Sequence, residues 1–346
     1  MNAILLVRLS AIGDIVFASP LVAALRRAYP QAHIAWLVQP EYRSLPEHHP
    51  DLDEVIVWPA HEWRERLRRR RFGSLVRELR TFRKHLRAHR FDLALDLQGL
   101  LKSGFLTYLS GARERIGLGS REGSHLLMTR VVRRGGDSNR IGSEYHFLAQ
   151  SLGLPTQDFS MAVPYGSEAA ACAHGLIERE GLSHGFAVIC PFTTRPQKHW
   201  LEPRWAELSE RLRAELGLPV VVLGGPGDRE AAGRIRDLAA AGPIDLTGKT
   251  TLPQAAALIA GCSLLVSVDT GLGHMGIAFS RPSLLLFGST CPYLDTTRAD
   301  ARVLYHRLDC SPCKRKPTCK GAFTCMQSIT VDEVLNAARN LLGRAA

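Results

Sequence analysis

Short apolar runs alternate with longer amphipathic stretches along most of this chain. Runs rich in Val, Ile and Leu are typical of buried strands, and they occupy Ile4–Leu9, Ile34–Val38, Glu54–Trp58, Leu93–Leu97, Phe186–Cys190, Val220–Gly224, Leu264–Val268 and Ser283–Phe287. Helical stretches lie between them, as at Ile15–Ala28, Trp205–Leu216 and Leu252–Gly261. Strands that alternate with helices predict parallel sheets with crossover helices, the α/β class.

The alternation is interrupted between residues 154 and 184, where Pro155, Pro164 and Gly166 occur. A helix over Ala169–Glu180 then leads to a fresh strand. The length of 346 residues allows about two domains. We therefore expect two Rossmann-like domains with parallel sheets facing a central cleft, residues 1–165 and 166–346.

A polar turn follows the strand predicted at 264–268. Asp269, Thr270 and Gly271 come directly after it, with His274 close behind. The apolar residues from Met275 onward predict that a helix opens there. N–H groups at a helix start, at the carboxyl edge of such a sheet, form an anion site. An ordinary N-capped helix is the alternative for the turn taken alone.

The first predicted strand ends in a turn that contains Ser10, Gly13 and Asp14 and leads into an apolar helix. A carboxylate at this position can simply complement the helix dipole. It can equally serve as a general base at the mouth of a cleft. The spacing alone leaves both interpretations open.

Common nucleotide-binding motifs are missing from the sequence. No G-x-G-x-x-G follows the first strand. Gly248-Lys249-Thr250 ends like a P-loop, but five residues separate Gly242 from Gly248 where that motif has four. A dehydrogenase or an NTPase is therefore disfavoured.

The formal net charge of +11 is concentrated in one segment. Residues 61–90 hold twelve Lys or Arg against three Glu, including four consecutive arginines at 68–71. A solvated helical face explains part of this, because Val76, Leu79, Phe82 and Leu86 would form its inner stripe. The density of charge also favours an anionic partner, namely nucleic acid, anionic lipid or a multiply phosphorylated acceptor.

Cys310, Cys313, Cys319 and Cys325 have the spacing C-x2-C-x5-C-x5-C. The first pair is spaced like zinc ligands, and four thiolates suffice for a closed structural zinc site. Iron–sulfur ligation, or a loop of reduced thiols or a disulfide, remains an alternative.

No apolar run approaches the ~20 residues that span a bilayer. The amino terminus lacks the basic and apolar segments of a signal peptide. We therefore expect a cytoplasmic protein whose cysteines are mostly reduced.

Further motifs complete a pattern that runs through most of the chain. They are Ser10-Ala11-Ile12-Gly13-Asp14, His48-His49-Pro50 to Val55-Ile56, Asp96-Leu97-Gln98-Gly99-Leu100-Leu101-Lys102-Ser103, Ser120-Arg121-Glu122, Thr193-Thr194-Arg195 with Lys198-His199-Trp200, and Ser267-Val268-Asp269-Thr270-Gly271 with His274. In this order they resemble the lipopolysaccharide heptosyltransferases of glycosyltransferase family 9. That resemblance implies an inverting glycosyltransferase with the two-Rossmann GT-B fold.

The resemblance also implies a catalytic set and a donor. Asp14 matches the general base, and Lys198 would meet the charge that develops on the departing diphosphate. The remaining donor contacts are expected from Thr193, Thr194, Asp269, Thr270, Gly271 and His274. The donor implied is ADP-heptose. No Asp-x-Asp motif stands near either turn, so we expect catalysis without a metal or other cofactor, with structural zinc at the cysteines at most.

The basic segment and the motif at 96–103 resemble the type I enzymes, which add the first heptose to a Kdo residue on lipid A. We expect the acceptor in the N-terminal domain, on the cytoplasmic face of the inner membrane, contacted by Ser10, Gly13, Arg64, Arg66, Arg68, Lys102 and Arg121. Transfer to an inner-core heptose, as in type II, or of another sugar is the alternative.

Two alternatives lie outside this activity. One is a basic nucleic-acid-binding protein with a zinc loop, and the other is an inactive scaffold bound to the envelope machinery. The nucleic-acid-binding alternative gives Asp14 and the turn at Asp269 no role, so we expect no nucleic-acid partner.

Overall fold

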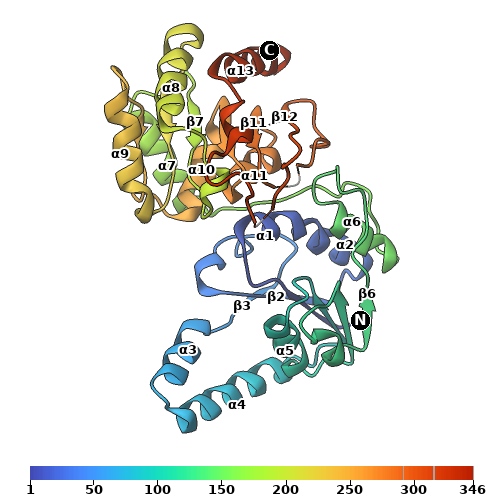
Figure 1. Ribbon diagram of the computed structural model, residues 1–346. Helices are drawn as coiled ribbons and strands as arrows, with labels where there is room; N and C mark the ends of the chain where they lie inside the picture. Colours follow the sequence, from blue (N-terminus) through green and yellow to red (C-terminus); the bar gives the residue numbers. More distant parts are fainter. Residues whose placement is uncertain (291, 315, 346) are drawn as a thin grey trace. The chain divides into compact units, whose positions relative to one another are not determined.

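The computed structural model describes residues 1–290, 292–314 and 316–345 (Figure 1). The chain divides into two compact units. Unit 1 comprises Met1–Ser138 and Gly142–Pro164, and unit 2 comprises Asn139–Ile141 and Tyr165–Ala346. Each unit contains a six-stranded parallel sheet with helices, which confirms the α/β class.

The sheet of unit 1 has the strand order β3-β2-β1-β4-β5-β6. Its strands are β1 (Ala3–Val7), β2 (His33–Val38), β3 (Glu54–Val57), β4 (Leu93–Asp96), β5 (Glu114–Leu118) and β6 (Arg130–Val132). Its helical segments are α1 (Ile12–Ala18), α2 (Pro20–Ala28), η1 (Pro40–Tyr42), α3 (Ala60–Arg68), α4 (Phe72–Ala88), α5 (Leu101–Leu109), η2 (Ser124–Leu127) and α6 (Ser143–Ser151). Val7 of β1 pairs with Asp96 of β4, so the turns that follow these strands meet at one edge of the sheet.

The sheet of unit 2 has the order β12-β11-β10-β7-β8-β9. Its strands are β7 (Ala187–Cys190), β8 (Val220–Val222), β9 (Ile244–Asp245), β10 (Leu264–Val268), β11 (Ser283–Phe287) and β12 (Ala301–Tyr305). Its helical segments are α7 (Ser167–Arg179), η3 (Pro196–Lys198), α8 (Glu202–Leu216), η4 (Pro226–Asp228), α9 (Arg229–Leu238), α10 (Leu252–Gly261), α11 (Gly271–Ala278), α12 (Thr324–Gln327) and α13 (Val331–Ala345). Strand β10 lies between β7 and β11, which brings three strand ends together.

The central strands have no exposed face. Every residue of β1, β4, β10 and β11 is buried. A strand covered by helices on both sides reads as a continuous apolar run rather than an alternating one. All eight strands predicted from the sequence are present, each within two residues of its expected bounds, although the edge strand β3 is only partly buried.

Four strands were not predicted, namely β5, β6, β9 and β12. Strands β6, β9 and β12 are edge strands of the two sheets. Charged residues such as Arg130 and Arg302 interrupt the apolar pattern of these strands. The helix expected over Ile15–Ala28 is two helices, because Pro20 starts α2 at its first position. The pattern of buried residues alone could not place this break.

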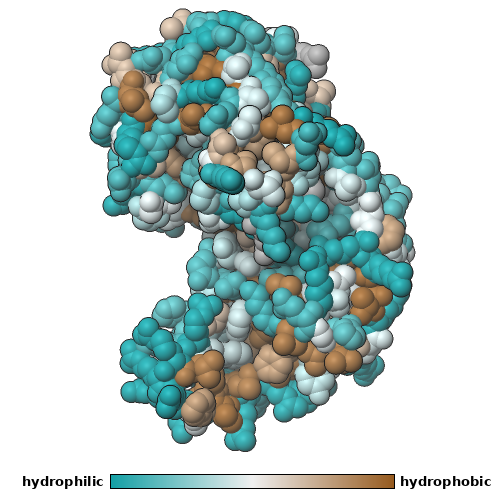
Figure 2. Space-filling view, viewed as in Figure 1, coloured by the Kyte–Doolittle hydropathy of each residue, from teal (hydrophilic) through white to brown (hydrophobic). Residues whose placement is uncertain are grey.

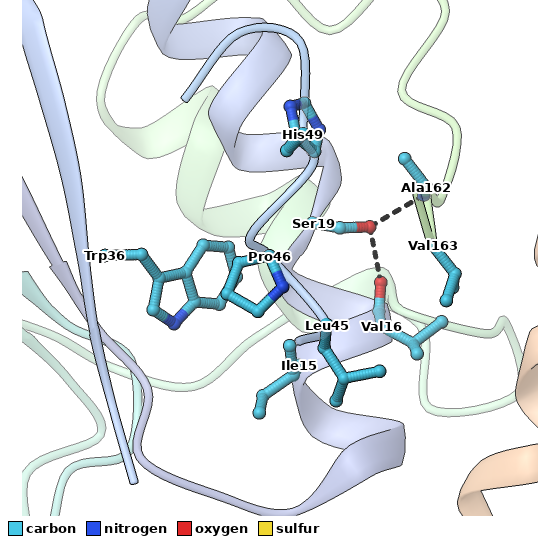
Figure 3. Close-up of a pocket in the computed structure, with 9 residues that line it drawn as sticks. All are labelled: Ile15, Val16, Ser19, Trp36, Leu45, Pro46, His49, Ala162 and Val163. Atoms are coloured by element: carbon cyan, nitrogen blue, oxygen red, sulfur yellow. Dashed lines mark hydrogen bonds between the residues drawn. The ribbon is translucent and has the colours of Figure 1, made fainter. Parts of the chain in front are cut away.

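A small internal cavity of about 10 Å³ lies beneath α1, and Figure 3 shows the side chains around it. Beside this cavity, Ser19 links the end of α1 to the last residues of unit 1. Its hydroxyl donates to the carbonyl of Val16 (2.7 Å) and accepts from the N–H of Ala162 (2.8 Å). His49 is buried at the same place, and burial lowers its pKa. These contacts pack residues near 162 against the helix that carries Asp14.

The basic segment folds as a hairpin of two helices, α3 and α4 (Figure 1). Phe82 and Leu86 of the expected inner stripe are buried, whereas Val76 is 43% exposed. The outer end of α4 therefore does not reach the core. Among the residues described, no helix is both long enough and apolar enough to cross a bilayer.

Candidate active site

Unit 2 gathers polar groups where β7, β10 and β11 end. Strand β10 ends at Val268, and α11 begins at Gly271, with Thr270 as the residue before the helix. The expectation that this helix opens at Met275 is therefore wrong by one turn. The N–H of Gly273 already donates to the carbonyl of Thr270 (3.1 Å), so the N–H groups of Gly271 and Leu272 are the ones that a helix start offers to a ligand near Asp269.

Lys198 and Asp269 form a largely buried ion pair at this edge. The Lys198 Nζ lies 2.5 Å from Asp269 Oδ2 and 3.3 Å from the carbonyl oxygen of the same residue. The two side chains are 16% and 13% exposed. Lys198 ends η3, which follows β7 in the chain. The structure thus joins two motifs that lie 71 residues apart.

His274 and Tyr293 extend this cluster. His274 Nε2 faces Asp269 Oδ1 at 3.6 Å, and its Nδ1 lies 2.6 Å from the hydroxyl of Tyr293. An N–H at Nε2 points a hydrogen at the carboxylate, which leaves Nδ1 to accept from Tyr293. Thr290 donates its hydroxyl to Asp269 Oδ2 at 2.6 Å. Tyr293 and Thr290 were missed from the sequence, although Thr290 follows the end of β11 closely.

The electrostatics of the cluster centre on Asp269. Burial alone would raise its pKa, but the bond to His274 and the charge of Lys198 hold the pKa of Asp269 well below its usual range. Burial and the charge of Asp269 raise the pKa of Tyr293 well above 10. The cluster therefore holds an ionised carboxylate that fixes a lysine beside a helix N-terminus, an arrangement suited to a bound anion.

Thr193 and Thr194 lie on the loop between β7 and η3. Thr193 is half-buried, and its carbonyl oxygen lies 2.8 Å from His199 Nε2, whereas Thr194 is exposed. Both precede Lys198 on the same loop at the same sheet edge. The expected donor residues of unit 2 thus come from two adjoining segments, one after β7 and one after β10.

In unit 1, Asp14 occupies the first turn of α1 and forms an ion pair with Arg8. Arg8 is almost fully buried, and it also donates to the carbonyl of Leu97 (2.8 Å). Burial alone would lower the pKa of Arg8, but Tyr145 and Asp14 hold it above its ordinary value. Arg8 was not predicted as a site residue. The sequence marks it only as a cationic residue at the end of an apolar strand.

The carboxylate of Asp14 remains partly open to solvent. Its side chain is 43% exposed. Among its contacts with described residues, the ion pair with Arg8 and the N–H of Ala11 both use Oδ2. Both of these contacts leave the second oxygen, Oδ1, unused.

The turn after β4 lies beside the turn after β1. The Leu9 N–H donates to Gln98 Oε1 (3.1 Å), which joins the two turns. Asp96 is fully buried and accepts from the N–H groups of Gln98 and Gly99, so it has a structural role. Gly99 has a φ of +68°, and a Cβ there would come within 2.6 Å of the carbonyl oxygen of Leu118. Only glycine fits this turn.

The expected acceptor residues separate into two groups. Ser10 and Arg121 lie on the loops after β1 and β5, and Gly13 and Lys102 lie in the first turns of α1 and α5. The Arg121 N–H donates to the carbonyl of Gly99 (2.7 Å). Arg64, Arg66 and Arg68 lie instead on α3 in the hairpin. Arg66 pairs with Glu78, and Arg68 lies 3.1 Å from Glu65. The hairpin's own carboxylates thus hold two of its three expected acceptor residues.

The four late cysteines are free thiols in one segment of unit 2. Burial and the neighbouring thiols raise the pKa of Cys313 and of Cys325. Among described residues, however, no three of their sulfur atoms lie within 4.8 Å of one another. The tetrahedral arrangement expected of a zinc site is therefore not formed as the segment stands. Cys291 lies outside the described residues.

Comparisons with known proteins identify the family of the chain. The chain matches the sequence model of glycosyltransferase family 9 (heptosyltransferase) over residues 79–323. Lipopolysaccharide heptosyltransferase 1 of Pseudomonas aeruginosa is 33% identical over 328 residues, 91% of this chain and 87% of that protein.

Solved structures show the same fold. The Escherichia coli ADP-heptose LPS heptosyltransferase II has a TM-score of 0.76 and 26% identity, covering 100% of this chain and 99% of that one. The E. coli heptosyltransferase WaaC, solved with ADP-2-deoxy-2-fluoro heptose, has a TM-score of 0.71 and 26% identity, covering 98% and 99%. The resemblance seen in the sequence motifs is confirmed, and the fold is that of the GT-B glycosyltransferases. The chain belongs to glycosyltransferase family 9, the heptosyltransferases.

Proposed function

We propose that this protein transfers L-glycero-D-manno-heptose from ADP-heptose to a Kdo residue of the lipopolysaccharide inner core, with inversion at the anomeric carbon. The observation that carries the proposal is the cluster of Lys198, Asp269 and His274 at the start of α11. A relative named lipopolysaccharide heptosyltransferase 1 supports the type I acceptor. The complex of WaaC with a fluorinated ADP-heptose supports the donor.

Unit 2 is the donor-binding half of this proposal. Lys198 and the first N–H groups of α11 supply positive charge for the diphosphate, with the Thr193 and Thr194 hydroxyls beside them. Asp269 would repel a diphosphate, so its part is to hold Lys198 and His274 and to accept from sugar hydroxyls. Because a lysine and helix amides meet the charge of the departing ADP, we expect no metal ion in the reaction.

Unit 1 supplies the base. The acceptor hydroxyl attacks the anomeric carbon of the heptose while the bond from that carbon to the diphosphate oxygen breaks. Asp14 accepts the hydroxyl proton through Oδ1, and Arg8 holds Oδ2 and so orients the carboxylate. Ser10, Gly13, Lys102 and Arg121 follow the carboxyl ends of β1, β4 and β5 and are the contacts we propose for the acceptor.

The hairpin is our candidate for contact with an anionic membrane surface. Arg68 to Arg71 at its tip are all exposed. Leu67 and Phe72 beside them are each 56% exposed. Figure 2 shows hydrophobic surface directly beside hydrophilic surface over this end of unit 1. Exposed apolar side chains among cations suit the interface of anionic lipid, and we infer peripheral binding to the cytoplasmic face of the inner membrane.

The test is transfer from ADP-heptose to two purified acceptors, followed by mass spectrometry. One acceptor is Kdo-lipid A, and the other already carries the first heptose. We expect a gain of one heptose on Kdo-lipid A and little or none on the second acceptor. Preferred transfer to the heptosylated acceptor would replace type I with type II, and transfer to neither would contradict the function.

The same assay tests the base. Asp14→Asn should lower turnover about 10²- to 10⁴-fold with nearly unchanged affinity for ADP, as expected for loss of general base catalysis. Glu41→Gln, at an exposed carboxylate of unit 1, is the matched control and should keep full activity. Turnover of Asp14→Asn within a few-fold of the wild type would rule out the assignment.

A further inference from the structure

A cluster of histidines surrounds one carboxylate at the opposite edge of the unit 1 sheet from Asp14. His33 is the first residue of β2, and Glu54 is the first residue of β3. His89 follows the last residue of α4. The amino ends of parallel strands point away from the edge where Ser10 to Asp14 lie, so the cluster belongs to no part of the candidate active site.

The ligand atoms of this cluster converge on one point. His33 Nε2 lies 3.1 Å from Glu54 Oε2, and His89 Nε2 lies 2.8 Å from the same oxygen. One atom from each of the three residues lies within 4.8 Å of the others. Among the described residues, this is the only group of three or more His, Cys, Asp or Glu side chains that meets this criterion.

The hydrogen bonds of His89 require a cation at its Nε2. Its Nδ1 lies 3.0 Å from the carbonyl oxygen of His85. A carbonyl only accepts, so Nδ1 carries the hydrogen, and the neutral ring then has a lone pair on Nε2. That lone pair faces a carboxylate oxygen, which also only accepts. Either a second proton or a metal ion must lie between Nε2 and Glu54.

The surroundings of His89 also suit a metal ligand. The His89 ring is held in place by Phe91, whose ring is stacked on it at a centroid distance of 5.1 Å. A backbone carbonyl bound to the far nitrogen of an imidazole is the usual support of a metal-ligating histidine. His33 is stacked beside His89 with centroids 5.7 Å apart, so both Nε2 atoms point to Glu54.

We propose that His33, Glu54 and His89 bind one divalent transition-metal ion of the zinc class. Two imidazoles and one carboxylate form a ligand set that zinc accepts, with a further position left for water. His85 Nε2 lies 4.0 Å from Glu54 Oε1, at the margin of the same cluster. The ion would join the starts of β2 and β3 to the end of α4 and so fix the base of the arginine-rich hairpin. Its role is structural.

The experiment titrates metal-free full-length protein with Co²⁺ and records absorption spectra. Cobalt bound by imidazole and carboxylate gives weak visible bands, whereas thiolate ligands add an intense near-ultraviolet band. This difference separates the proposed site from the four cysteines. We expect one equivalent of Co²⁺ with weak visible bands, displaced by Zn²⁺. Glu54→Gln and His89→Ala should each weaken this binding at least about tenfold.

His125→Ala, at an exposed histidine of unit 1, is the matched control and should bind as the wild type does. Circular dichroism of each variant shows whether it folds. If His89→Ala does not fold, the result for Glu54→Gln, which keeps the shape of the side chain, is decisive. Binding only with a thiolate band would overturn the proposal. Cobalt binding that is unchanged in folded Glu54→Gln would show an adventitious ion only, and would equally overturn it.

Discussion

A carboxylate removed from water needs compensating charge and hydrogen bonds, and Asp269 receives the charge from Lys198 and a hydrogen bond from His274. Because its pKa is held below the usual range, the ionised carboxylate stabilises the folded state at neutral pH. This contribution is fully present above the unfolded value of about 4 and is lost as the pH falls through the lower folded pKa. The pair therefore stays ionised throughout the physiological range.

Lys198→Ala tests the proposed diphosphate contact. A hydrogen bond between charged groups contributes about 1.5–3 kcal/mol, so we expect the affinity for ADP and ADP-heptose to fall about 10- to 150-fold. Turnover should fall too, because the same charge meets the departing ADP. Isothermal titration calorimetry measures the first effect, and the transfer assay measures the second.

Lys249→Ala is the matched control for this variant. Lys249 lies in the segment that ends like a P-loop, it is exposed, and its Nζ donates to the carbonyl of Asp245 (2.6 Å). We expect the Lys249→Ala variant to bind ADP as the wild type does, because this segment only resembles a P-loop and is not part of the proposed donor site. Unchanged affinity in Lys198→Ala, or an equal loss in both variants, would remove Lys198 from the donor site.

Among the elements, the α3–α4 hairpin has the clearest separable role. Its apolar inner side reaches the core through Phe82 and Leu86, while the tip with Arg68 to Arg71 is held by little beyond the carboxylate of Glu65. An element fixed at its base and charged at its tip can be altered at the tip without loss of the fold.

Changing Arg68 to Arg71 into glutamines should raise the apparent KM for the lipid acceptor and leave that for ADP-heptose unchanged. Each arginine near an anionic surface contributes about 1 kcal/mol, and the contribution weakens with salt. We therefore expect weaker binding to vesicles that contain anionic phospholipid, measured by sedimentation at two salt concentrations.

A control of equal charge places four glutamines at Arg133, Arg213, Arg281 and Arg302, which are exposed elsewhere. This variant should bind vesicles far better than the tip variant. If the two variants lost binding equally, net charge rather than the hairpin would explain it. A rise in both KM values would indicate damage to the fold instead.

At the scale of the whole molecule, the division into two units predicts that donor binding is local. Saturating ADP should slow amide hydrogen exchange around residues 193–200, 268–276 and 288–293 of unit 2. The hairpin of unit 1 makes no proposed contact with the nucleotide, so its exchange should not change. Hydrogen–deuterium exchange with mass spectrometry measures both. Protection confined to unit 1 would contradict the assignment of the donor to unit 2.

The sequence by itself determined the fold class, eight of the twelve strands described and the family. Central strands covered on both faces require unbroken apolar runs, and the turns after them require particular residues, such as Gly99 at its positive φ. Both signals are local in the chain, so they can be read without the structure. Asp14, Asp269 and His274 could be proposed for the same reason, since each lies in the turn or first helical turn that follows a predicted strand.

Only the tertiary structure decided which of these residues meet. Strand order brings Lys198 to Asp269 and Arg8 to the turn after β4, and it adds Thr290 and Tyr293. It also places two of the basic acceptor candidates in ion pairs within the hairpin and assembles His33, Glu54 and His89 from three separate elements. These partners depend on the pairing of strands distant in sequence, and no local pattern of hydrophobic and polar residues encodes that pairing.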